Sequence, residues 1–128
     1  MESVEYLFDT NILIYYNNNS IPNNKIELIE EILKLSFNIS IITKMEYLGW
    51  KKLTEFDYEL SKEFISQANI LIIDDLVVET TIEIKRKTNI KLPDAIIAAT
   101  CLVYDLTLIT RNERDFERIE KLKILNPF

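Results

Sequence analysis

The sequence predicts an α/β fold built on a mainly parallel central sheet. Short apolar segments of strand type alternate with segments of helix type along the chain, which is the pattern of a parallel sheet covered by helices. The strands are apolar throughout instead of alternating, as expected for strands buried on both faces. Residues 93–103 are apolar on nearly every helical face, so we expect them to form a helix buried in the middle of the fold.

The strands are expected where short runs of β-branched and other apolar residues occur. The first run leads directly into Asp9, the third ends at Asp74, and the last precedes Asn126 and Pro127. Polar and turn-forming residues at these points favour short strands over helices. The predicted strands comprise residues 4–8, 37–42, 70–73, 106–109 and 122–125.

The helices are expected where apolar residues recur at helical spacing. Asp9-Thr10-Asn11 supplies cap chemistry for the first helix, and Asp74-Asp75 caps the fifth, whose basic end complements the helix dipole. In the fourth helix we expect Leu60, Phe64 and Ile65 to point inward. The predicted helices comprise residues 12–16, 25–35, 45–50, 58–68, 76–87 and 93–103.

Composition indicates one domain that has a single core. The chain has 128 residues, of which 48% are hydrophobic and 28% are charged, as in an ordinary globular protein. No apolar run is long enough to cross a membrane, and no segment resembles a signal peptide. The single cysteine, Cys101, excludes an intramolecular disulfide and fits a reducing compartment. We expect one domain over residues 1–128, in the cytoplasm and without membrane contact.

Missing residue types exclude several kinds of site. The chain contains no histidine, which excludes histidine bases, histidine-containing triads and histidine metal sites. The one glycine, Gly49, stands alone, which excludes the glycine-rich loops that bind nucleotide phosphates. Catalysis, if present, must use carboxylates, hydroxyls, lysines or a bound metal.

Charge is unevenly distributed along the chain. The net charge is −6, but residues 1–84 carry 15 acids and 6 bases, whereas residues 85–128 carry 6 acids and 9 bases. A local basic rim can attract an anionic polymer even when the whole protein is acidic. The overall negative charge therefore does not exclude a nucleic-acid substrate.

Four carboxylates are expected at one edge of the sheet. Asp9 follows the first strand directly, Glu46 lies one helical turn after the second, and Asp115 lies just after the strand at residues 106–109. Asp94 begins the buried helix, whose N-terminus can face the same edge. Because ligands of an open parallel sheet bind outside the carboxyl ends of the strands, we expect the four acids to converge.

Each of these acids also has a purely structural interpretation. Asp9 and Asp94 can be helix caps, Glu46 can lie on a solvated helix face, and Asp115 can be a turn residue. Clustered carboxylates repel one another, and a hard divalent cation relieves that repulsion. Ligation by oxygen alone suits Mg²⁺ or Mn²⁺ and disfavours zinc, so the predicted cofactor is Mg²⁺ or Mn²⁺.

Four segments of the chain form one pattern: residues 6–11, 43–47, 92–100 and 108–116. Together they resemble a PIN domain and, more narrowly, the VapC-like toxins of prokaryotic toxin–antitoxin pairs. The resemblance covers essentially the whole chain, including residues 125–127. It implies a three-layer α/β/α sandwich and a Mg²⁺- or Mn²⁺-dependent endoribonuclease, inhibited by a cognate antitoxin and commonly a homodimer.

The resemblance also implies roles for particular residues. Asp9, Glu46, Asp94 and Asp115 match the acidic quartet of the family, in which the three aspartates hold metal and the glutamate binds metal or helps to deprotonate the attacking water. The expected reaction is RNA hydrolysis that leaves a 3′-hydroxyl and a 5′-phosphate. Asn11, Thr110 and Asn112 match polar residues that orient the carboxylates or the water; some relatives have an acid at the position of Asn112. The bases expected to contact the RNA backbone are Lys91, Arg111 and Arg114.

Other functions stay open at this point. One is a PIN-type nuclease of RNA processing outside a toxin system, although the short chain favours the toxin. Another is a phosphatase with Asp9 as nucleophile, which Asn11 disfavours because such sites want a second aspartate there. A third is a non-catalytic α/β interaction module, against which the retention of all four acids argues. The aromatic residues Tyr15, Tyr16, Tyr47 and Trp50 suit the core, a dimer interface, or a groove for a peptide or an unstacked base.

Overall fold

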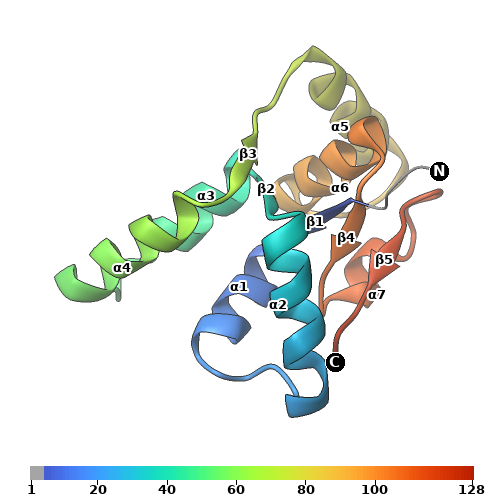
Figure 1. The fold of residues 1–128 in the computed structure, drawn as a ribbon. Coiled ribbons are helices and arrows are strands. Elements are labelled where there is room, and N and C mark those ends of the chain that lie inside the picture. Colours follow the sequence, from blue (N-terminus) through green and yellow to red (C-terminus); the bar gives the residue numbers. More distant parts are fainter. Residues whose placement is uncertain (1–4) are drawn as a thin grey trace.

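The computed structural model describes residues 5–128 and contains one five-stranded sheet with the order β3-β2-β1-β4-β5 (Figure 1). All four neighbouring strand pairs are parallel, which confirms the predicted parallel sheet. The strands are shorter than the sequence predicted, and Val4, which was expected in the first strand, lies outside the described residues. The strands are β1 (Tyr6–Phe8), β2 (Asn38–Ser40), β3 (Asn69–Leu71), β4 (Thr107–Ile109) and β5 (Ile124–Leu125).

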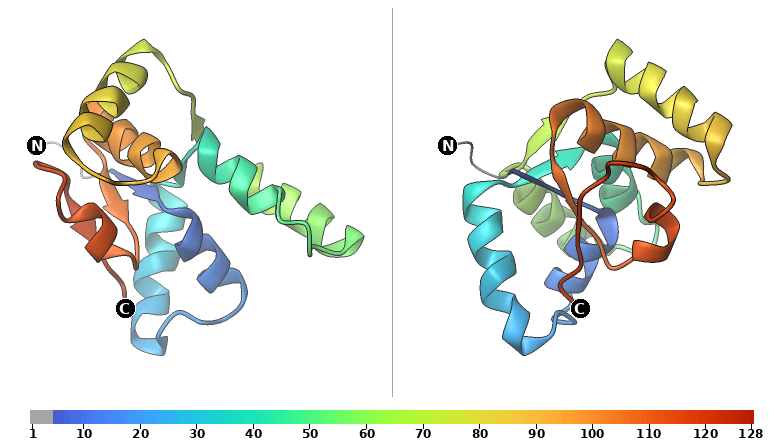
Figure 2. Two further views of the ribbon diagram at one scale, coloured as in Figure 1. Left: turned by 180° about the vertical axis from the view of Figure 1, so that it is seen from behind. Right: turned by 90° about the vertical axis from the view of Figure 1, so that its right-hand side faces the viewer.

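Helices connect the strands and cover both faces of the sheet (Figures 1 and 2). A short 3₁₀-helix, η1 (Asn23–Lys25), lies directly before α2. No helix of residues 5–128 is long and apolar enough to cross a membrane. The α-helices are α1 (Thr10–Asn17), α2 (Ile26–Leu35), α3 (Ile41–Leu48), α4 (Glu55–Ile65), α5 (Asp75–Lys87), α6 (Leu92–Tyr104) and α7 (Glu113–Phe116).

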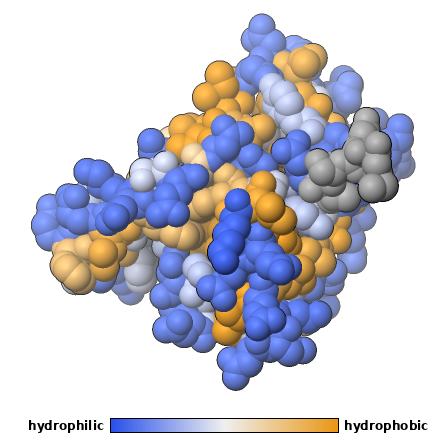
Figure 3. Space-filling model, viewed as in Figure 1, coloured by the Kyte–Doolittle hydropathy of each residue, from blue (hydrophilic) through white to orange (hydrophobic). Residues whose placement is uncertain are grey.

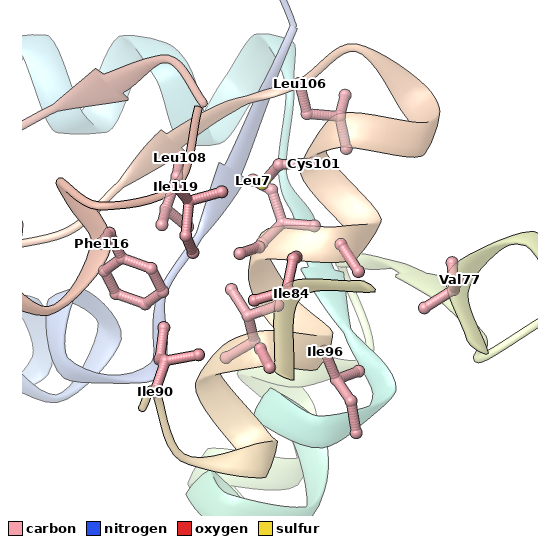
Figure 4. Packing of buried hydrophobic residues seen from close by; sticks show 14 residues of the cluster. Leu7, Val77, Ile84, Ile90, Ile96, Cys101, Leu106, Leu108, Phe116 and Ile119 are labelled. Atoms are coloured by element: carbon pink, nitrogen blue, oxygen red, sulfur yellow. The ribbon is translucent and has the colours of Figure 1, made fainter. Parts of the chain in front are cut away.

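The sheet separates two hydrophobic clusters, because successive side chains of a strand point to opposite faces. Leu7 of β1 and Leu108 of β4 face a cluster built largely from α5 and α6 (Figure 4). The next residues, Phe8 and Ile109, face a second cluster that includes the buried residues of α1 and α2. This arrangement is the predicted α/β/α sandwich.

Helix α6 is the buried central helix that the sequence predicted. Residues 95–101 are all buried, and α6 packs beside α5. The helix has a proline in its first turn and ends at Asp105, whose φ of 53° is left-handed. Such a residue closes the last turn of a helix, as expected for a helix-end residue. The position of α6 fixes where Asp94, in its first turn, meets the sheet.

Helix caps explain two of the boundaries that differ from the sequence prediction. The strand predicted through residue 42 ends at Ser40, whose hydroxyl accepts a hydrogen bond from the Ile42 amide at 3.1 Å. This cap starts α3 at Ile41, so the β-branched pair at 41–42 is helical. Helix α4 begins before residue 58 because the Thr54 hydroxyl accepts a hydrogen bond from the Asp57 amide at 3.1 Å. Asp57 therefore lies in the first turn of α4.

Helices α3 and α4 project from the body of the molecule, and we call this pair the α3–α4 arm (Figures 1 and 2). The projection explains why Leu60 is 51% exposed, although the sequence predicted that it points inward. Ile65, at the base of α4, is buried in the cluster that contains Phe8. Only the end of α4 that reaches the sheet can therefore bury its apolar side chains in the core.

Candidate active site

The candidate site lies where the strand order reverses. β1 continues to β2 and β3 on one side, and the chain later crosses to β4 and β5 on the other. The crevice between β1 and β4 is therefore the topological switch point, where open α/β sheets bind their ligands. Asp9 follows β1 and Thr110 follows β4, so the two residues lie next to each other at this point.

Asp9 is 5% exposed and uses both of its carboxylate oxygens. Its Oδ1 accepts a hydrogen bond from the Thr10 amide at 2.8 Å, which caps α1. Its Oδ2 accepts hydrogen bonds from the Thr110 hydroxyl at 2.8 Å and from the Asn11 side-chain amide at 3.3 Å. Asp9 thus combines the predicted cap with the predicted contacts to Asn11 and Thr110.

The surroundings of Asp9 make its charged form less favourable than that of an ordinary aspartate. Burial raises the pKa of Asp9 to about 6; the hydrogen bond from Thr110 opposes the shift, and the charges of Asp94 and Glu46 add to it. These carboxylates therefore lie close enough to repel one another. A cation bound among them would offset this repulsion and lower the pKa of Asp9.

Glu46 is exposed on α3, and its side chain is oriented by two threonines. The Thr10 hydroxyl donates a hydrogen bond to Oε1 of Glu46 at 2.7 Å, and Oγ1 of Thr10 is 3.0 Å from Oγ1 of the fully buried Thr43. Sequence reasoning did not assign a site role to Thr10 or Thr43. The sequence could have indicated Thr43, because it lies three residues before Glu46 and residues three apart share a helix face.

Asp94 lies in the first turn of α6, half-buried, and it does not cap the helix. The N-cap residue is Lys91, and no side chain makes a capping hydrogen bond there. Burial raises the pKa of Asp94, the charges of Glu46 and Asp115 raise it further, and Lys91 lowers it. The cap interpretation of Asp94 is therefore wrong, and the residue lies among the other acids.

Asp115 joins the site through the turn that follows β4. The side-chain amide of Asn112 donates a hydrogen bond to Oδ2 of Asp115 at 2.6 Å. The backbone amide of Asn112 donates to the Thr110 hydroxyl at 2.9 Å, and Thr110 in turn donates to Asp9. Asp115 is exposed and acts on the pKa of Asp94. The predicted polar residues thus link the two carboxylates that lie farthest apart in sequence.

The carboxylate set fits a hydrated hard cation. Among residues 5–128 no three aspartates, glutamates or cysteines lie close enough to form a ready-made metal cluster. Mg²⁺ commonly takes one or two carboxylates and keeps several waters, so it does not need such a cluster. Oδ1 of Asn11 is buried with no hydrogen-bond partner, although its own side chain contacts Asp9. An oxygen of this kind can accept a hydrogen bond from a water of the cation, and unsatisfied it costs about 1–3 kcal/mol.

A groove of about 820 Å³ lies beside the carboxylates, between α1 and the α3–α4 arm. Its lining includes Thr10 and Glu46 together with the apolar side chains of Ile14, Trp50 and Leu60. Figure 3 shows apolar surface along the arm. A molecule that filled this groove would cover one side of Glu46.

The three predicted basic contacts have different surroundings. Lys91 is close enough to Asp94 to lower the pKa of that carboxyl. Arg114 is exposed on the short helix α7. Arg111 is also exposed, but it contacts the rings of Tyr15 and Phe128. Only Arg111 therefore has a defined packing arrangement.

The fold is a doubly wound sandwich, and carboxylates gather at its switch point. A comparison with known protein families identifies the class. The PIN domain family matches residues 6–122, and the chain belongs to this family. This confirms the resemblance drawn from the sequence.

Individual relatives narrow the comparison. Ribonuclease VapC2 of Methanocaldococcus jannaschii is 30% identical to the chain, over 98% of this chain and 95% of that protein. A toxin–antitoxin complex from Klebsiella pneumoniae contains a chain that is 33% identical, with a TM-score of 0.75, over 97% of this chain and 98% of the other. A DNA-bound VapBC complex from Salmonella typhimurium gives 27% identity and a TM-score of 0.82, over 98% and 100% of the two chains.

Proposed function

We propose that the chain is a metal-dependent endoribonuclease that acts as the toxin of a toxin–antitoxin pair. The observation that carries the proposal is the meeting of Asp9, Glu46 and Asp94 at the switch point of a PIN fold. The whole-length similarity to a VapC ribonuclease and to toxin–antitoxin complexes supports it. We propose that it acts in the cytoplasm, where cellular RNA is present.

The proposed ligands of Mg²⁺ or Mn²⁺ are Asp9, Asp94 and Asp115, directly or through water. The cation supplies an activated water and offsets the charge of the scissile phosphate. Thr110 and Asn11 hold Oδ2 of Asp9 in one orientation, and Asn112 does the same for Asp115.

Glu46 is the proposed ligand or proton acceptor for the attacking water. Its Oε1 is oriented by the Thr10 hydroxyl, which leaves Oε2 for the water or the cation. In-line attack on phosphorus breaks the bond to the 3′-oxygen and leaves a 3′-hydroxyl and a 5′-phosphate. Proton transfer to a positioned carboxylate is general base catalysis, which contributes roughly 10²–10⁴-fold to a rate.

The proposed protein partner is a cognate antitoxin. The similar structures from Klebsiella and Salmonella are a toxin–antitoxin complex and a VapBC complex. The groove between α1 and the arm includes Glu46 in its lining, so a peptide bound there would block the carboxylate. We also propose that residues 1–128 form one domain, because both hydrophobic clusters pack on the same sheet.

The deciding experiment is cleavage of total RNA by the partner-free protein with Mg²⁺, with Mn²⁺ and with EDTA. Asp94→Asn is compared with Asp105→Asn, which changes an exposed carboxylate at the other end of α6. We expect discrete cuts that require metal, fall at least about a hundredfold in Asp94→Asn, and persist in Asp105→Asn.

Circular dichroism of both variants checks the fold. We expect Asp94→Asn to stay folded and to melt higher than wild type in EDTA, since it removes a carboxylate whose charged form is disfavoured. Cutting that survives both EDTA and Asp94→Asn would contradict the proposal. An unfolded Asp94→Asn would assign Asp94 a structural role instead.

A further inference from the structure

Arg111 is held between two aromatic rings that come from distant parts of the chain. Its guanidinium carbon lies 5.1 Å from the ring centroid of Tyr15 in α1 and 4.3 Å from that of Phe128. The two rings also contact each other, with centroids 5.2 Å apart and ring planes at 66°. We call these three residues the Arg111 stack.

The stack leaves the hydrogen-bonding groups of Arg111 available. Within residues 5–128 the two ion pairs are Glu59–Lys62 and Asp105–Lys123, so Arg111 forms no ion pair with a carboxylate there. A guanidinium that lies over aromatic faces keeps its in-plane N–H groups free, and these match the geometry of a phosphate. The rings also restrict the side chain before it binds anything, which lowers the entropic cost of binding.

The residues of the stack are close neighbours, along the chain or along α1, of residues that contact the carboxylates. Thr110, the residue before Arg111, donates to Asp9, and Asn112, the residue after it, donates to Asp115. Tyr15 lies four residues after Asn11 and therefore on the same face of α1, one turn along the helix. An RNA strand whose scissile phosphate lies at the carboxylates would pass close to Arg111.

We propose that the Arg111 stack is a preformed binding site for a backbone phosphate of the RNA substrate, next to the phosphate that is cleaved. Arg111 is the binding residue, and Tyr15 and Phe128 are positioning residues that act through it. This assignment rests on the proposed ribonuclease function. Lys91 is a weaker candidate because the neighbouring Asp94 already engages its charge, and Arg114 has no ring against it among the described residues.

The test measures binding of a fluorescein-labelled single-stranded RNA of mixed sequence by anisotropy, in Mg²⁺ and over a range of salt concentrations. Asp94→Asn is the parent, so that the RNA stays intact. Each phosphate contact on a single strand contributes about 0.7 to the slope of log affinity against log salt. We expect Arg111→Ala to lower the slope by about 0.7 and Arg111→Lys to keep the slope while binding more weakly. Arg86→Ala, which removes an exposed arginine from α5, is the charge-matched control and should leave the slope unchanged.

The positioning role is tested at Phe128. Phe128→Leu keeps apolar bulk but loses the ring face, whereas Phe128→Tyr keeps the face. We expect Phe128→Leu to retain the salt slope and to bind about two- to fivefold more weakly, with Phe128→Tyr at the parent affinity. A purely structural role would lower the affinity of both variants or of neither.

The outcomes separate this inference from the proposed function. If the parent binds RNA and Arg111→Ala keeps its full salt slope, the Arg111 stack is not a phosphate site, although the nuclease proposal stands. If Arg86→Ala lowers the slope as much as Arg111→Ala does, the effect is one of overall charge, and the inference fails. If the wild type neither cleaves nor binds RNA, both proposals fail.

Discussion

At the scale of single residues, the charged form of Asp9 is unfavourable in the cation-free molecule. Its folded pKa of about 6 lies above the ordinary value of 3.8, so the folded state binds a proton more tightly than the unfolded chain. The charged form is therefore the destabilising one. Stability must rise as the pH falls from 7 through 6 toward 4, by up to about 3 kcal/mol from this residue.

This pH dependence is measured by thermal melts in EDTA between pH 7 and pH 5. The wild type should gain stability relative to Asp9→Asn as the pH falls, because only the wild type carries the buried carboxyl. Using the difference between the two proteins removes the contribution of other carboxylates, whose protonation acts on both. Parallel profiles would mean that Asp9 is solvated or paired in a way that the structure does not contain.

A second residue-scale prediction concerns Thr10, whose hydroxyl orients Glu46. Thr10→Val keeps the shape of the side chain and removes the hydrogen bond, so Glu46 loses its defined position. We expect RNA cleavage to fall about 10- to 100-fold, as is typical when a residue that orients a ligand is lost, with the fold intact by circular dichroism.

Thr10→Ser is the matched control, because it keeps the hydroxyl and should keep most of the activity. The quantity to compare is the cleavage rate as a function of Mn²⁺ concentration. Equal rates for Thr10→Val and wild type would show that Glu46 needs no orientation by this hydroxyl.

At the scale of elements, polar side chains tie three strands together. The Asn38 side-chain amide in β2 donates to the carbonyl of Tyr6 in β1 at 2.8 Å. The side-chain amide of Asn69 in β3 donates to Oδ1 of Asn38 at 3.0 Å. Asn38 is buried, whereas Asn69 is exposed on the edge strand. The pair therefore aligns β2 and β3 beside β1 in the register that delivers α3 and Glu46 to the site.

We expect Asn38→Leu to destabilise the fold by about 1–3 kcal/mol, because it leaves the buried Tyr6 carbonyl with one fewer partner and Ser36 without its side-chain donor. Asn69→Leu should cost less, since water can replace its contacts at the edge. Urea unfolding of both variants measures the two free energies. The same loss in both would show that burial of Asn38 is not what makes it costly.

The sequence predicted elements well where local and tertiary preferences agree. Helix α6 is apolar on every face and is buried, and Asp74 caps α5 through a 2.9 Å hydrogen bond to the Val77 amide. It failed where they conflict. The β-branched residues Ile41 and Ile42 favour a strand, yet the Ser40 cap and packing place them in α3. Propensity alone cannot decide whether such residues extend a strand or begin a capped helix.

The part of the candidate site that could be predicted from the sequence is the part that lies at the ends of strands. The acids could be placed because each follows a strand or opens the buried helix. The roles of Thr10 and Thr43 depend on where the side chains of α1 and α3 meet, which requires coordinates. The Arg111 stack depends on the end of the chain returning to α1, and no local pattern marks such a contact.

At the scale of the whole molecule, an exposed apolar surface points to self-association. The segment between β3 and α5, and α5 itself, carry five large exposed apolar side chains: Ile72, Ile73, Leu76, Val78 and Ile82. Exposed apolar side chains that gather on a protein surface commonly mark a protein interface. We therefore propose that a second copy covers it, which gives the homodimer expected from the family resemblance.

Leu76→Glu tests the homodimer. Leu76 is 65% exposed in the first turn of α5, where a negative charge is compatible with the helix dipole, so the variant should fold. In the dimer the same charge would be buried, and we expect the dissociation constant to rise at least about tenfold.

Leu35→Glu is the control, because Leu35 is 87% exposed at the end of α2 and outside this surface. Light scattering after size exclusion, over a series of concentrations, measures the mass. A monomeric wild type, or a dimer that Leu76→Glu leaves intact, would rule out this surface as the dimer interface.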